Sequence, residues 1–164
     1  MANAIKLNEG IVKVFAASGG DALWTPTSVA NAAGRLSAQL DLGAAPRAKL
    51  YRWVLVAKMV ATPAAGASLR PYLVMASSAA TTYQDGLVGV SDAAAASETP
   101  YIYQARLLQS CLTQAVTTSQ VWSGRTLILP RYVSFMLWNA SGAALSGTAA
   151  DCLFRLEPVY DEVQ

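Results

Sequence analysis

The sequence predicts an all-β protein: one antiparallel β-sandwich of seven or eight strands, jelly-roll-like and with little helix. Three observations lead to this fold class. Apolar residues alternate with polar ones at every second position in several segments, turn residues separate these segments, and strong helix signals are missing between them. Apolar residues make up 54% of the 164 residues and charged residues 13%, which excludes a disordered chain.

The clearest alternation covers residues 35–42, where apolar side chains hold the even positions and polar ones the odd positions. A helix from Ser28 to Leu42 is the alternative, since Ser28 could cap it, alanine is abundant and Gly43 could end it. We prefer a strand, because the alternation has no exception across the segment.

The next strand is expected at 50–60, with Tyr51, Trp53, Leu55, Ala57 and Met59 on one face. Pro71 lies in the strand expected at 69–77, and it indicates an edge strand or the start of a strand. Leu107 and Leu108 interrupt the period, which indicates a bulge or a change of strand. The remaining strands are expected at 69–77, 101–118, 122–129, 131–139 and 150–159, with Cys152, Phe154 and Leu156 pointing inward from the last.

The chain is expected to form a single domain over residues 1–164, because neither a repeat nor a shift in composition divides it. Residues 1–27 would form an N-terminal arm with the first strand, and 158–164 a short acidic tail. Residues 77–99 read as a long connection, in which the run Ala93–Ala96 could form a short helical turn. Such a long connection is usually functional or covered by a neighbour.

The composition excludes several kinds of chemistry. Without histidine there is no Ser-His-Asp triad, no Cys-His pair and no histidine-bound metal. Glycine motifs that bind phosphate are also missing. The candidate carboxylates lie mostly beside Gly, Ser or Ala, where aspartate stabilises turns; they are Asp21, Asp41, Asp85, Asp92, Glu98 and Asp151. We therefore expect no enzyme, no catalytic residue, no cofactor and no metal site.

Charge and hydropathy also limit the partners. The net charge is +2, and the eight arginines are scattered rather than clustered, so we expect no nucleic-acid partner. They read either as solvated residues on polar strand faces or as interface residues. No apolar run is long enough to cross a bilayer, and the start of the chain does not resemble a signal peptide. Cys111 and Cys152 lie in apolar contexts that favour two buried thiols over a disulfide.

Aromatic and apolar residues outside the expected core could contact a partner. Val54 and Val56 on one strand, and Met136 and Trp138 on another, occupy faces that should meet water in a monomer. Three interpretations remain open: a second small core under a loop, protein–protein anchors, or a platform for stacking sugars. The candidate protein-contact residues are Trp24, Tyr83, Tyr101, Arg131, Met136 and Trp138.

Four segments resemble small virion proteins of tailed bacteriophages. They are 28–42 (SVANAAGRLSAQLDL), 48–60 (AKLYRWVLVAKMV), 129–145 (LPRYVSFMLWNASGAAL) and 151–164 (DCLFRLEPVYDEVQ). The resemblance implies a jelly-roll capsid cement or decoration subunit, without catalytic residues, that bridges major capsid proteins on the outer head. It also implies self-association as a dimer or trimer and assembly in the host bacterial cytoplasm, where the two thiols would stay reduced. The alternatives are another virion component, from the tail, collar or fibre base, or a β-sandwich that binds host glycans.

Overall fold

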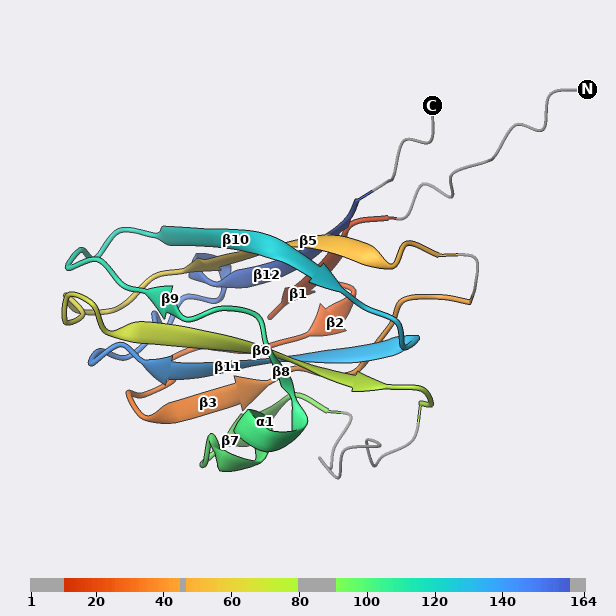
Figure 1. Cartoon of the computed structure of the whole chain (residues 1–164). Coiled ribbons are helices and arrows are strands. Elements are labelled where there is room, and N and C mark those ends of the chain that lie inside the picture. The colour runs from red at the N-terminus through yellow and green to blue at the C-terminus, as the bar shows by residue number, and fades with distance from the viewer. Residues whose placement is uncertain (1–10, 45–46, 80–90, 160–164) are drawn as a thin grey trace, which may run out of the picture.

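Two β-sheets pack face to face in the computed structural model, which describes residues 11–44, 47–79 and 91–159 (Figure 1). The predicted β-sandwich is thereby confirmed. The first sheet has five strands, in the order β10 (Gln120–Leu127), β5 (Leu50–Ala57), β12 (Leu153–Pro158), β1 (Lys13–Ala16) and β2 (Ala22–Leu23). All its pairs are antiparallel except β1–β2, which is parallel.

The second sheet has seven strands. Its main path is β7 (Ala93–Ala95), β3 (Ala33–Leu36), β11 (Tyr132–Ala140), β6 (Ser68–Ala76) and β8 (Arg106–Leu107). Beside this path, β4 (Leu40–Asp41) pairs with β11, and β9 (Cys111–Leu112) pairs with β6. The described residues thus form twelve strands rather than seven or eight, because several predicted strands divide into pieces of two or three residues.

The main core lies between the two sheets. Phe135 of β11 stacks on Phe154 of β12, with ring centroids 3.8 Å apart and planes within 5°. Phe15 of β1 contacts both rings at 5.6–6.1 Å. The inward faces predicted for β5 and β12 are confirmed, since Trp53, Leu55 and the other residues of those alternations are buried.

Residues 28–42 contain two short strands, β3 and β4, and no helix, so the preference for a strand over a helix is confirmed. The alternation is divided between β3 and β4, with Ser37–Gln39 between them. Ser28 and Ala32 both have left-handed backbones (φ 56° and 59°), which a continuous right-handed helix does not allow.

Residues 101–104, predicted as the start of the strand at 101–118, belong instead to the short helix α1 (Thr99–Gln104). Pro100 is suited to the first turn of a helix, where no backbone N–H is needed. A strand would place Tyr101 and Tyr103 on the same face. In the helix they point to different sides, so Tyr101 is buried and Tyr103 is exposed. The predicted break at 107–108 is confirmed, because β8 ends at Leu107 and β9 begins at Cys111.

Two smaller expectations also change. The run Ala93–Ala96 contributes a strand, β7, rather than a helical turn, and it pairs with β3. Pro71 lies within β6, which has β11 on one side. On the other side, β9 pairs with Ser68–Leu69 and β8 with Tyr72–Leu73, so the proline falls between these two short partners.

Candidate interaction surface

The outer face of the seven-stranded sheet is covered by the chain itself. The helix α1 packs on this face, and β7, which leads toward it, extends the sheet beside β3 (Figure 1). A second apolar cluster forms there, from Leu36, Tyr72, Val74, Ala76, Ala95, Tyr101, Met136 and Trp138. The interpretation of a second small core is therefore the one the structure supports for this face.

Two carboxylates fasten residues 91–105 to the sheet. Asp92 accepts hydrogen bonds from Arg35 Nε (2.7 Å) and Nη2 (2.6 Å), and also from the backbone N–H and hydroxyl of Thr25. Glu98 accepts from Arg70 Nη1 and from the Tyr72 hydroxyl, both at 2.6 Å. These carboxylates, considered as catalytic candidates in the sequence, are thus hydrogen-bonded parts of the structure.

Acid should weaken this attachment at Asp92. Burial alone would raise the pKa of Asp92, but hydrogen bonds from Arg35 and Thr25 outweigh it and hold the pKa below its usual value. The folded state then binds fewer protons than the unfolded state, so Asp92 stabilises the fold above the unfolded pKa of about 3.9 and loses this effect as the pH falls further.

We expect Asp92→Asn to lower the free energy of unfolding at pH 7 by about 1–3 kcal/mol, because a neutral amide replaces the charged acceptor. The difference from the wild type should shrink between pH 4 and pH 2. Urea denaturation across this pH range measures both quantities. A constant difference would show that the charge of Asp92 contributes nothing.

Most of the predicted contact residues lie in one of the two cores. Trp24 and Met136 are fully buried, and Tyr101 and Trp138 are less than a tenth exposed. Their side chains already pack within the chain, so the structure does not favour these four as anchors for a partner. Tyr83 lies outside the described residues.

Arg131 remains at the surface, but its charge is paired. Its Nε and Nη2 donate to the two Asp41 oxygens at 2.8 and 2.6 Å, and its guanidinium lies 5.2 Å from the ring centre of Tyr132. This pair holds β4 against the start of β11. The pKa of Asp41 is lowered, mainly by the hydrogen bond from Arg131.

The two cysteines are free thiols, as expected. Both are buried in the main core, Cys111 on β9 and Cys152 just before β12. Burial raises the pKa of Cys111 to about 12 and also raises that of Cys152, so both thiols are neutral at physiological pH.

The outer face of the five-stranded sheet is different, because no described helix or strand lies over it (Figure 1). Direct cross-strand partners share a face of a sheet. On this basis the register places Arg52 of β5 beside Arg125 of β10 and Glu157 of β12, and places Arg155 of β12 beside Val54. We call Arg52, Arg125, Arg155 and Glu157 the arginine face.

The arginine face has a net positive charge, because it contains three arginines and one glutamate. Glu157 forms ion pairs with Arg52 (3.5 Å) and Arg155 (3.9 Å). In the part of the chain that the structure describes, Arg125 has no ion pair, although it lies directly opposite Arg52. Like charges directly opposite each other destabilise a sheet. A negatively charged partner would relieve this repulsion.

Apolar side chains lie at both ends of the arginine face. Val56, Val121 and Leu153 occupy one row of the sheet, and Leu50 and Leu127 another. Val121 is 62% exposed and Leu127 43% exposed. Val54, in contrast, is only 4% exposed, so the predicted apolar outer face is present but lies mainly toward β10.

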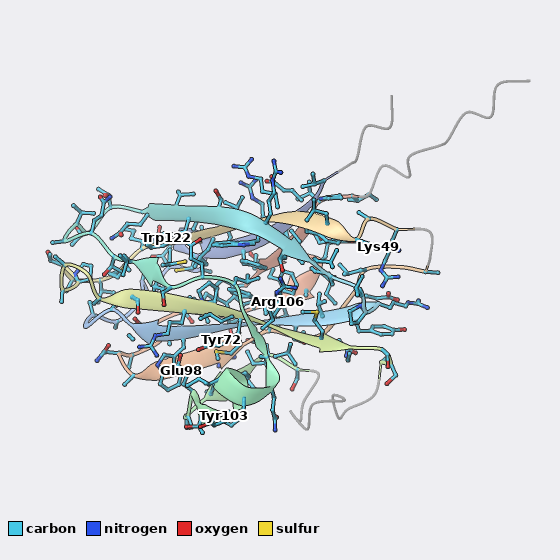
Figure 2. All side chains as sticks on the ribbon, in the orientation of Figure 1. Lys49, Tyr72, Glu98, Tyr103, Arg106 and Trp122 are labelled. Carbon is cyan, nitrogen blue, oxygen red and sulfur yellow. The ribbon has the colours of Figure 1, made fainter. Side chains whose placement is uncertain are left out.

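The sequence could not group these arginines, because positions 52, 125 and 155 become neighbours only through the strand order β10–β5–β12. Strand alternation predicts that Arg52 and Arg155 point outward, but it does not show that they lie near each other. Tyr103 on α1, labelled in Figure 2, is 82% exposed, whereas strand alternation predicts it on the same face as the buried Tyr101.

Residues 11–44, 47–79 and 91–159 contain no group of three or more His, Cys, Asp or Glu side chains that could hold a metal ion. None of their helices has the length and hydropathy needed to cross a membrane. Asn139, which begins an N-x-S glycosylation pattern, is fully buried near the end of β11, just before a turn.

Comparison with known proteins adds no assignment: no family model matches the chain, and no curated protein matches its sequence significantly.

Proposed function

We propose that this protein is a non-enzymatic virion subunit that decorates the outer head of a tailed bacteriophage. In this role it stabilises contacts between neighbouring major capsid proteins, and the arginine face is its docking surface. The observation that carries the proposal is an uncovered sheet face with three clustered arginines and exposed apolar residues beside them. The resemblance of four segments to small phage virion proteins directs the proposal to a capsid.

The chemistry of this face suits attachment to protein. Arginine is enriched at protein interfaces because its planar guanidinium forms paired hydrogen bonds with carboxylates. A sheet presents these groups on a stiff backbone, so little conformational entropy is lost on binding. The partner surface should therefore be acidic and partly apolar.

Stabilisation of the shell follows from linkage. A subunit that binds the assembled shell but not loose capsid proteins shifts the equilibrium toward the shell. Purified protein should therefore bind mature heads and raise the temperature at which they come apart. Heads that are equally stable with and without bound protein would contradict the cement role.

Arg125→Glu tests the docking surface directly. The new carboxylate would lie opposite Arg52 and could pair with it, so the fold should keep its stability. We expect binding to heads to weaken by at least about tenfold, because one attractive charge becomes repulsive toward an acidic partner. Cosedimentation of protein with heads measures the change.

Lys49→Glu is the matched control, since it alters the net charge by the same amount. Lys49 is exposed and lies at one end of the molecule, away from the centre of the arginine face (Figure 2). Its variant should bind almost as the wild type does. Equal loss in both variants would mean that only net charge matters, and no loss in either would exclude this face.

The number and position of copies separate a decoration subunit from another virion component. Many copies spread over the head support decoration, whereas a few copies at the tail or at one vertex support a tail, collar or fibre-base protein. The glycan-binding alternative is weaker for Trp24 and Tyr101, because both side chains are buried.

A further inference from the structure

The outer edge of β10 has unused backbone hydrogen-bonding groups. β10 pairs with β5 through eight consecutive residues and with no other described strand. Just beyond it, Ile128 N donates to Lys49 O at 2.7 Å. Backbone groups alternate in direction along an antiparallel strand, so the even-numbered residues of β10 face β5. The N–H and C=O groups of Val121, Ser123 and Arg125 therefore point away from the sheet, and no described residue bonds to them.

This edge has little protection against pairing. Natural edge strands are commonly short, or carry charged residues (lysine above all), proline or a bulge. β10 has eight residues in unbroken register and contains neither lysine nor proline, and Arg125 is its one charged residue. Leu127 O accepts a hydrogen bond from Arg106 Nη1 (3.1 Å), which leaves one lone pair of that carbonyl available. The edge can thus accept another strand.

We propose that the added strand is β10 of a second copy of this chain, antiparallel, with the two-fold axis at Gly124. In this register Val121 lies opposite Leu127 of the second copy, and Ser123 lies opposite its Arg125. Every outward N–H and C=O of one strand then meets its counterpart on the other. The axis falls on a residue without a side chain, where the two backbones come closest.

Neighbouring registers are less favourable. Moving the axis to Arg125 would place the two copies of Arg125 directly opposite each other, and such like-charge pairs are destabilising. Moving it to Ser123 would place Val121 opposite Arg125 and leave Leu127 without an apolar partner. Of these three registers, only the one about Gly124 pairs apolar Val121 with apolar Leu127 and keeps the two copies of Arg125 from lying directly opposite each other.

The same register joins the two apolar ends of the outer sheet face. Val121 continues the row of Val56 and Leu153, and Leu127 continues that of Leu50. Pairing about Gly124 places the Val121 row of each copy next to the Leu127 row of the other copy, so the dimer contains two such joined rows. It therefore covers side chains that are 62% and 43% exposed in the single chain. The result is one ten-stranded sheet with a continuous outer face.

Sedimentation equilibrium of the full-length protein tests this proposal without any phage head, so it is independent of the proposed function. The wild type should be a dimer that dissociates on dilution. Val121→Lys should raise the dissociation constant by at least about tenfold, because it places a charge in the apolar row. Ile102→Lys is the matched control: Ile102 is 53% exposed but lies on α1, far from β10, and its variant should dimerise normally.

Ser123→Asp tests the register itself. About Gly124, the new carboxylate lies opposite Arg125 of the second copy, so the dimer should become tighter. About Ser123, the two new carboxylates would oppose each other and weaken it. A wild type that is monomeric at all concentrations, a dimer insensitive to Val121→Lys, or a dimer weakened by Ser123→Asp would each overturn the proposal.

Discussion

Replacing Trp24 by alanine is expected to lower the free energy of unfolding by about 3–5 kcal/mol, close to the whole stability of many domains. The Trp24 side chain is fully buried and meets Phe135 edge-on, with ring centres 4.8 Å apart. Its indole N–H donates to Arg35 O at 3.2 Å. The substitution would remove a large part of the core and leave that carbonyl without its donor.

Urea denaturation followed by circular dichroism measures this loss. Tyr103→Ala is the control, because Tyr103 is 82% exposed and its loss should change stability by less than about 0.5 kcal/mol. If Trp24→Ala were as stable as the wild type, Trp24 would not be the core residue described above.

Replacing Asn139 by aspartate is expected to cost about 3–5 kcal/mol at pH 7, although the two side chains have nearly the same shape. The Asn139 amide nitrogen donates to three backbone carbonyls, of Val29 (3.0 Å), Ala30 (3.2 Å) and Ala143 (2.8 Å). A carboxylate there would face three acceptors in a buried site. Protonation would relieve part of this repulsion, so the loss should be smaller at pH 5 than at pH 7.

Asn31→Asp is the matched control for this variant. Asn31 is exposed, and the bond described for it uses only its side-chain oxygen, which accepts from Gly142 N at 2.9 Å. Aspartate keeps such an oxygen, so stability should hardly change. Equal destabilisation of both variants would show that burial and amide donation at Asn139 are not what matters.

Sequence periodicity could predict only those elements that are long enough to repeat it. The faces of β5 and β12 were predictable because each strand is long enough for several turns of the two-residue period, as Trp53, Leu55 and Phe154 show. The helix α1 was not predictable. It has only six residues, and over so short a segment the same order of apolar and polar residues fits either a strand or a helix with one buried tyrosine. Trp24 was misplaced for a related reason: it follows a two-residue strand, so no periodicity marks it as core.

The candidate docking surface depended on information that is not local. Arg52, Arg125 and Arg155 are far apart in the sequence and belong to three different strands, so only the order of the sheet brings them together. The burial of Met136 and Trp138 in a cluster with residues of β7 and α1 is likewise a tertiary arrangement. Their apolar face was predicted correctly, but its partner is the chain itself rather than another protein.

A density map of phage heads carrying the bound protein, obtained by electron cryo-microscopy, would show which surface of the protein contacts the shell. We expect the outer face of the five-stranded sheet, with Arg52, Arg125 and Arg155, to face an acidic surface of the shell. Contact through α1 and β7 instead, with the arginine face exposed to solvent, would contradict this expectation.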